Sequence, residues 1–159
     1  MEKDKLVFRQ VKSEDTGAID GIFQILCRCG EDMYLNQGLS HWKTPYPKET
    51  IRQSCSDNAV FLVEADGEEV ASFQIVHDGD TAHLVKFAVV PEQAGKGIGN
   101  TCLQYIFQWS RERNIAILCG NVYEKSTQAL SFYVKNGFEI VGSSTGKRFT
   151  VYLIEKMLL

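Results

Sequence analysis

The ten residues from Val90 to Gly99, VPEQAGKGIG, constrain the fold of this chain more than any other segment. They follow an apolar run at 83–89 that predicts a buried strand, and they precede residues 100–113, whose apolar side chains recur at helical spacing. Three glycines occupy alternate positions in the segment. A strand, a short glycine loop and a helix that starts at the last glycine predict a phosphate-binding site, because backbone N–H groups and a helix N-terminus attract anions.

The glycine loop differs from two common phosphate-binding patterns. A Walker loop has Ser or Thr directly after Gly-Lys, whereas Gly97 and Ile98 follow Lys96 here. A dinucleotide fingerprint, Gly-x-Gly-x-x-Gly, is one residue longer and lies on the first strand of its domain, yet more than half of this chain precedes the loop. A glycine-rich turn without a ligand is the alternative interpretation of the segment alone.

Length and composition limit the class of protein. A chain of 159 residues is long enough for one domain with a substantial core, and we expect a single domain over residues 1–159. The net charge of -3, with no clustering of Lys and Arg, argues against a nucleic-acid partner. No apolar run is long enough to cross a membrane, and residues 1–5 lack the apolar stretch of a signal peptide. We therefore expect a cytoplasmic protein without a membrane partner.

The cysteines give no sign of a metal site. Their number, five, is odd, which predicts free thiols in a reducing compartment. Cys27 and Cys29 stand two positions apart, and on a helix their side chains would point in different directions. No second Cys or His pair lies at metal-ligand spacing, so no metal is expected.

Hydrophobic periodicity and turn residues predict one α/β domain. Strands are expected at residues 6–11, 59–65, 69–77, 82–90, 115–122, 138–143 and 148–157, with a hairpin at Asp66-Gly67. Helices are expected from a Ser13 cap through Cys27 and at residues 48–56, 99–113 and 126–136, whereas residues 30–47 are expected to be irregular. The fold class is a mixed, largely antiparallel central sheet of about seven strands, with a parallel crossover at the glycine loop and about four flanking helices.

Three motifs follow one another along the chain: Phe87-Ala88-Val89-Val90-Pro91, then Gly95-Lys96-Gly97-Ile98-Gly99, then residues 129–138 (ALSFYVKNGF). The first resembles the Leu-x-Val-x-Pro strand end of the GCN5-related N-acetyltransferases, the GNAT family. The second is similar to the second half of that family's Gln/Arg-x-x-Gly-x-Gly/Ala loop, and the third to its Ala-x-x-Phe-Tyr-x-x-x-Gly-Phe signature. With the matching order of elements, the resemblance covers essentially the whole chain.

The resemblance implies the acyl-CoA N-acyltransferase fold and an N-acetyltransferase that uses acetyl-CoA as cosubstrate. It implies that a primary amine attacks the thioester directly, and that a backbone N–H of the fourth strand, here that of Val89, stabilises the oxyanion. Phe87 and Val89 would pair with the pantetheine amides as an added strand would. The residues implied to bind acetyl-CoA are Phe87, Ala88, Val89, Ala94, Gly95, Lys96, Gly97, Ile98, Gly99, Asn100 and Ser126.

Two of these positions depart from the family pattern. Ala94 stands where the family has Gln or Arg, with Gln93 one position earlier, so a side chain that caps the loop is missing while the backbone donors remain. Ser126 stands where the family often has Asn, and its shorter hydroxyl would contact a bound water or the pantetheine. Both changes concern the affinity for acetyl-CoA.

Tyr133 matches the tyrosine that protonates the departing thiolate in the family, so it is the expected general acid, with a core tyrosine as the alternative. Residue type gives four candidates for the base that deprotonates the amine: His83, Glu92, His77 and His41. We predict His83, because strand alternation gives it the same face as Phe87 and Val89. In several relatives water and backbone carbonyls take this proton.

The sequence leaves the acceptor and two alternative functions open. In this fold the segment after the first helix commonly lines the acceptor pocket, and here it contains Glu31, Asp32, Tyr34, His41, Trp42 and Tyr46. Aromatic side chains suit an apolar or cationic small-molecule amine, although Trp42 could instead be a core residue. The alternative functions are a catalytically silent acyl-CoA-binding or regulatory domain, which Ala94 slightly favours, and acetylation of protein amines. A homodimer is compatible with each of these functions.

Overall fold

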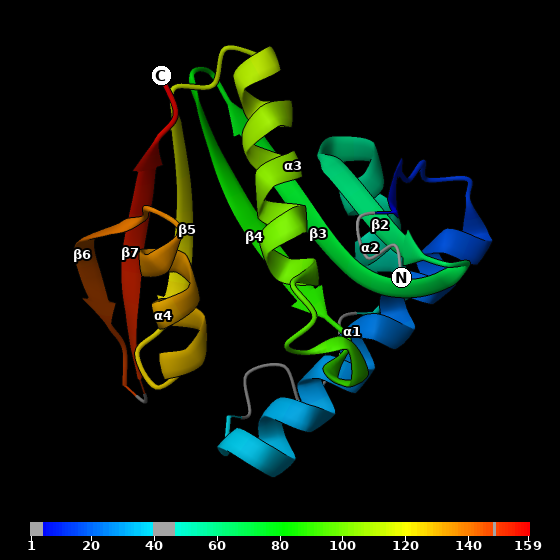
Figure 1. Cartoon of the computed structure of the whole chain (residues 1–159), viewed down its shortest axis with the longest axis horizontal. Helices are drawn as coiled ribbons and strands as arrows, with labels where there is room; N and C mark the ends of the chain where they lie inside the picture. The colour runs from blue at the N-terminus through cyan, green and yellow to red at the C-terminus, as the bar shows by residue number, and fades with distance from the viewer. Residues whose placement is uncertain (1–4, 40–46, 148) are drawn as a thin grey trace. The chain divides into compact units, whose positions relative to one another are not determined.

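The computed structural model describes residues 5–39, 47–147 and 149–159. In chain order its elements are β1 (Leu6–Gln10), α1 (Thr16–Gln37), α2 (Lys48–Asp57), β2 (Ala59–Ala65), β3 (Glu68–Asp78), β4 (Thr81–Val89), η1 (Pro91–Gln93), α3 (Ile98–Glu112), β5 (Ile117–Tyr123), α4 (Thr127–Lys135), β6 (Glu139–Thr145) and β7 (Thr150–Met157). The described strands form a seven-stranded sheet with the order β1-β2-β3-β4-β5-β7-β6 (Figure 1). β4 and β5 are parallel, whereas β1–β2, β2–β3, β5–β7 and β6–β7 are antiparallel. The predicted fold class is confirmed.

Two compact units make up the chain, Met1–Ile75 with Lys86–Cys102, and Val76–Val85 with Leu103–Leu159. We call them the first unit and the second unit. β3, β4 and α3 each continue from one unit into the other. In β4 the boundary falls at Lys86, whose φ of 52° lies in the left-handed region that non-glycine residues rarely adopt. This conformation interrupts the regular alternation of side chains along β4.

The core of the first unit contains α1 and β2. Buried side chains of α1 recur at helical spacing: Ala18, Ile19, Ile22, Ile25, Leu26 and Cys29. β2 is buried from Ala59 to Val63, and aromatic rings pack beside it, since Phe61 stacks on Phe73 with ring centroids 5.0 Å apart. Full burial of a side chain of this size contributes about 1.5–3 kcal/mol. Neither α1 nor any other helix in the described ranges is both long and apolar enough to span a membrane.

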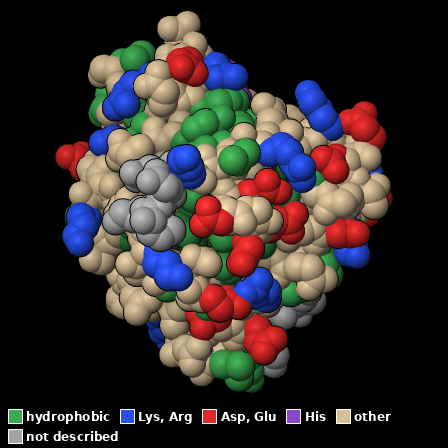
Figure 2. Space-filling model, turned by 45° about the vertical axis from the view of Figure 1, so that its right-hand side comes forward, with side chains coloured by type: hydrophobic (Ala, Val, Ile, Leu, Met, Phe, Trp, Pro, Cys, Tyr) green, Lys and Arg blue, Asp and Glu red, His purple; other side chains and the backbone are tan. Residues whose placement is uncertain are grey.

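α2 packs against α1 and β2 and buries one apolar side chain. Ile51 is almost fully buried, whereas the ion pair between Lys48 Nζ and Asp20 Oδ1, at 3.0 Å, is half exposed. The same ammonium lies over the ring of Phe23, 5.2 Å from its centroid. Figure 2 shows acidic side chains interspersed with Lys and Arg on one face of the molecule. Exposed pairs of this kind contribute about 0–1 kcal/mol each, so buried Ile51 is the stronger attachment.

Both ends of α1 differ from the sequence prediction. The N-cap is Asp15, which accepts a hydrogen bond from Ala18 N at 3.2 Å, and not Ser13. The helix continues to Gln37, so the prediction of an irregular segment from residue 30 is wrong for residues 30–37. Gly30 lies within the helix, where burial outweighs its cost of about 1 kcal/mol, and Asn36 donates to Asp32 one turn earlier. Gly38, with φ of 69°, ends the helix in the left-handed conformation that favours glycine.

The second unit contains β5, β6, β7 and α4, with β7 between the other two strands (Figure 1). Its core includes Leu118 and Val122 of β5 and Ile154 of β7. Phe107 of α3 lies beside Phe138, with ring centroids 6.1 Å apart. β6 is the edge strand and is exposed along nearly its whole length. The second unit therefore buries its centre and leaves one edge of the sheet open.

Candidate active site

The glycine loop follows β4 in the first unit, as predicted. Gly95 and Gly97 have φ of 79° and 81°, a left-handed conformation that glycine adopts without strain. A Cβ built on either glycine would meet no atom of the described residues within 4 Å. Backbone torsion, and not crowding by neighbouring protein atoms, is therefore the reason for glycine at both positions.

The loop leads directly into α3. Ile98 is buried and anchors the first turn of the helix, whereas residues 94–97 are exposed. Thr101 donates to Gly97 O through its backbone N and its Oγ1, each at 3.1 Å. Helix geometry leaves the N–H groups of Ile98 and Gly99 without partners inside the helix. An exposed loop, a helix N-terminus and exposed Lys96 together make a surface suited to a phosphate group.

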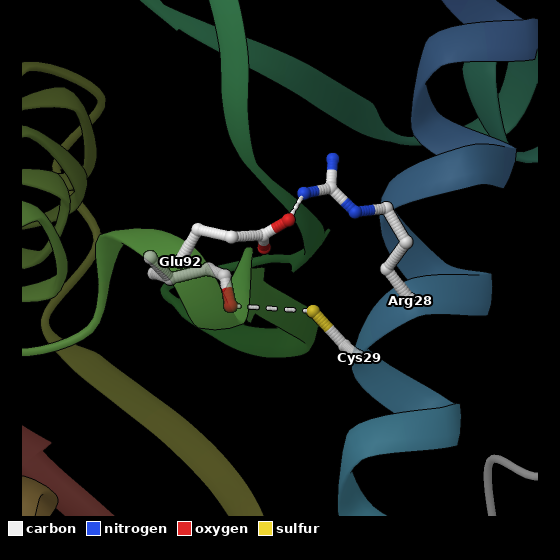
Figure 3. Close-up of polar contacts among 4 residues, drawn as sticks. Arg28, Cys29 and Glu92 are labelled. Carbon is white, nitrogen blue, oxygen red and sulfur yellow. Dashed lines mark hydrogen bonds and ion pairs between the residues drawn. The ribbon is translucent and has the colours of Figure 1, made fainter.

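The end of β4, just before the loop, is held by other parts of the first unit. Val90 N donates to Val70 O at 2.9 Å, and Cys29 Sγ of α1 donates to Val89 O at 3.3 Å (Figure 3). Phe87 lies edge-on to Phe73, with ring centroids 5.9 Å apart. Sequence reasoning missed Cys29, because a helical pattern places it on a buried face without naming its partner 60 residues away.

Tyr133 lies on α4 in the second unit. Its ring centroid is 5.2 Å from that of Phe138 and 5.3 Å from that of Phe132, and its side chain is half-buried. Burial raises the pKa of the Tyr133 phenol above its usual value near 10, so the phenol keeps its proton at neutral pH. Tyr133 therefore carries the proton that a general acid needs.

Ser126 is the N-cap residue of the same helix. It is buried, yet within the described structure its side chain makes no capping hydrogen bond. The position of Ser126 at the helix N-terminus agrees with the motif, and its hydroxyl is not used to cap α4.

The predicted base candidates lie in different environments. His83 is exposed and pairs in register with Cys119 of β5. His77 Nε2 lies 2.8 Å from Gly79 O within the turn between β3 and β4. Glu92 forms an ion pair with Arg28. His41 lies outside the described residues, as do Trp42 and Tyr46.

Residues 31–34, at the start of the segment predicted to line the acceptor pocket, belong to α1. Tyr34 lies on the last turns of α1 and is 42% exposed, so part of the segment predicted to line the acceptor pocket is helical. Asp32 accepts a hydrogen bond from Asn36, and Glu31 is exposed.

Over residues 5–39, 47–147 and 149–159, no group of three or more His, Cys, Asp and Glu side chains could hold a metal ion.

Comparison with known proteins identifies the family. The profile of the acetyltransferase (GNAT) domain matches residues 56–140, more than half of the chain. This range contains the end of β4, the glycine loop, Ser126 and Tyr133. The chain therefore belongs to the GNAT family of acetyltransferases and is an acetyl-CoA-dependent N-acetyltransferase. No curated protein is significantly similar in sequence.

Solved structures share the fold at low sequence identity. PaiA N-acetyltransferase from Thermoplasma acidophilum, in complex with coenzyme A, has a TM-score of 0.80 and 20% identity over 96% of this chain and 99% of that one. The ribosomal-protein-S18-alanine N-acetyltransferase from Escherichia coli has a TM-score of 0.78 and 18% identity over 96% and 94%. A spermidine N-acetyltransferase chimera from Vibrio cholerae and hSSAT has a TM-score of 0.76 and 15% identity over 97% and 96%.

Proposed function

We propose that this enzyme transfers the acetyl group of acetyl-CoA to a primary amine of a small molecule. The observation that carries the proposal is the glycine loop, where two left-handed glycines lead from β4 into the N-terminus of α3. The backbone of Ala94 to Asn100 would bind the pyrophosphate, with exposed Lys96 adding a positive charge. The negatively charged pyrophosphate needs hydrogen-bond donors. The backbone N–H groups of the loop are present even though Ala94 replaces the Gln or Arg of the family pattern.

In the proposed reaction, Phe87 and Val89 bind the pantetheine amides through the backbone of β4, with Ala88 between them. The Val89 N–H stabilises the negative charge that develops on the thioester oxygen while the amine nitrogen bonds to the carbonyl carbon. When the carbon–sulfur bond breaks, Tyr133 donates its phenolic proton to the thiolate of CoA. Ser126 would contact the pantetheine directly or through water.

The amine must also lose a proton, and His83 is an indirect candidate for this step. His83 lies near the N-terminal end of β4 and Val89 at its C-terminal end, so roughly 20 Å of strand separates them. A base that acts directly must come within hydrogen-bond reach of the amine. We therefore propose that the proton passes to water, with His83 contributing at most through a relay.

The acceptor class is proposed from the charge and aromatic content of the segment that follows Gly30. Tyr34 and the acidic Glu31 and Asp32 suit a cationic amine. Among the similar structures, one is a spermidine N-acetyltransferase chimera and another an N-acetyltransferase of an alanine in a ribosomal protein. The assay of the acceptor therefore includes both small-molecule amines and a peptide amine. The assay is thiol release from acetyl-CoA over polyamines, aromatic amines, amino acids and a peptide with N-terminal alanine.

This assay separates the three functions. Turnover with a small amine but not with the peptide supports the proposal, and the reverse result favours a protein acceptor. Binding of acetyl-CoA in calorimetry without turnover on any amine favours a silent acyl-CoA-binding domain. The Gly97→Val variant serves as the control for binding at the loop.

We also propose that residues 1–159 act as one acetyltransferase domain. The support is that β3, β4 and α3 each run through both compact units, so neither unit can unfold without losing part of these elements. A single thermal transition, detected alike by tryptophan fluorescence and circular dichroism, is expected. Five free thiols favour a reducing compartment such as the cytoplasm as its location.

A further inference from the structure

Two neighbouring residues of α1 contact the segment where β4 ends (Figure 3). Cys29 Sγ donates a hydrogen bond to Val89 O at 3.3 Å. The guanidinium of Arg28 pairs with the carboxylate of Glu92 in η1, three residues further along the chain. We call these two contacts the α1 clamp. It joins a long, well-packed helix to the start of the glycine loop.

The α1 clamp acts on a peptide group that is also held from the opposite side. The peptide between Val89 and Val90 contributes Val89 O, which accepts from Cys29, and Val90 N, which donates to Val70 O at 2.9 Å. A peptide group is planar, so hydrogen bonds at both its oxygen and its nitrogen fix its orientation. The ψ torsion of Val89 is thereby restricted, which limits the directions that the Val89 N–H of the preceding peptide group can take.

We propose that Cys29 is a positioning residue for acetyl transfer: it holds the Val89–Val90 peptide so that the Val89 N–H points at the oxygen of the bound thioester. The inference rests on the proposed function, in which that N–H stabilises the developing oxyanion. Such a donor is effective only when it is already oriented before the reaction. Arg28 has the lesser role of holding η1, from which the glycine loop begins.

The environment of Cys29 suits a donor and not a nucleophile. Its side chain is 7% exposed, and burial raises the pKa of the thiol to about 12, with Asp32 acting in the same direction. The thiol therefore keeps its proton, which the hydrogen bond to Val89 O requires, and it is a poor target for alkylation. Cys27, on the same helix, is more exposed and provides a matched control.

The two parts of the α1 clamp differ in strength. The side chains of Arg28 and Glu92 are 45% and 61% exposed, so water and salt screen their attraction. The thiol of Cys29 is buried and its hydrogen bond is partly buried, so this contact is screened less than the ion pair. Loss of the ion pair should therefore have a small, salt-dependent effect, and loss of the thiol a larger one.

The test compares Cys29→Ala, Cys29→Ser and Cys27→Ala. We expect Cys29→Ala to lower kcat about tenfold while the Kd for CoA changes less than twofold. The expected fall in kcat is smaller than the fall caused by removing an oxyanion donor altogether, because the Val89 N–H is still present. Cys29→Ser keeps a donor and should recover most of the activity, and Cys27→Ala should match the wild type. Arg28→Gln should raise KM for acetyl-CoA about twofold at low salt and not at high salt.

A spectroscopic readout makes the inference independent of turnover. The carbonyl stretch of bound acetyl-CoA, isotope-labelled at the thioester carbon, should lie at lower wavenumber in the wild type than in Cys29→Ala, because the Val89 N–H polarises the carbonyl. An unchanged stretch and unchanged kcat in a folded Cys29→Ala variant would overturn the inference while the proposed function stands. A parallel loss of melting temperature, kcat and CoA affinity that serine does not restore would show a purely structural role. If the carbonyl stretch differs between the wild type and Cys29→Ala but the wild type acetylates no amine, the proposed function alone is contradicted.

Discussion

The two units hold their functional groups in different ways. In the first unit the end of β4 is fixed by contacts from β3 and α1, and α1 itself is anchored by a row of buried side chains. In the second unit Tyr133 lies on α4, a helix of nine residues in which none of the described residues is fully buried. Aromatic packing with Phe132 and Phe138 holds its ring.

The difference follows from the kind of group that each unit would contribute to the proposed reaction: a backbone N–H in the first unit and a side-chain phenol in the second. Backbone donors have no side chain of their own to adjust, so their direction depends on how rigidly the surrounding elements are packed. A phenol is placed by its rotamer and its ring contacts, which a short helix can supply. Substitutions should therefore act on affinity and orientation in the first unit and on one proton transfer in the second.

The sharpest test of the second unit is Tyr133→Phe. It removes one hydroxyl and keeps the ring, so the fold and the affinity for CoA should be retained while kcat falls by about a hundredfold or more. Because burial raises the pKa of Tyr133, the wild-type kcat should show no alkaline decline from this group up to about pH 10. Thiol release is measured where chemistry limits the rate.

Tyr105→Phe, at another partly buried tyrosine, is the control for this experiment. Wild-type turnover in Tyr133→Phe would assign Tyr133 to the core and remove the proton donor from the proposed reaction.

The corresponding test of the first unit is Gly97→Val. Valine cannot adopt the φ of 81° without strain, so the loop should rearrange and the Kd for CoA should rise at least about tenfold, or about 1.4 kcal/mol. Calorimetry measures the affinity, and a thermal melt shows that the variant is folded. Gly17→Ala, at a glycine without a left-handed φ and with open space around it, should bind CoA as the wild type does. Equal affinity in folded Gly97→Val would place the pyrophosphate elsewhere.

A smaller effect is expected at the position where the loop departs from the family pattern. Ala94→Gln restores a polar side chain beside donors that are already present, so CoA should bind equally or up to about threefold more tightly. The measurement is calorimetry with CoA at constant salt. A large loss of affinity would show that alanine at this exposed position is adapted to a different ligand or partner.

The smallest effect is expected for His83→Gln, which changes kcat less than about twofold if the amine loses its proton to water. The pH profile of kcat/KM is the informative measurement, because a residue that takes the proton directly gives this profile an acid limb. Loss of that limb in His83→Gln, with a large fall in kcat, would restore His83 as the base.

The sequence alone determined the order of the elements, because helical and strand periodicities and turn residues are local signals. Asp66 and Gly67 have φ of 51° and 83°, as their hairpin pattern predicts, and the loop glycines are left-handed. The prediction failed at residues 30–37, where a buried Gly30 did not end the helix. Helix boundaries depend on burial as well as on propensity, and burial is not local.

Tertiary structure alone decided which groups meet. The bond from Cys29 to Val89 joins residues 60 positions apart, and the left-handed Lys86 interrupts an alternation that had placed His83 on the same face as Phe87. Sequence periodicity predicts neither feature. It places the Cys29 thiol on a buried helix face without specifying its partner, and lysine is not a residue type that indicates a left-handed conformation. The sequence therefore named the loop and the tyrosine as candidates. Packing in three dimensions determined how the strand that carries the Val89 N–H is held.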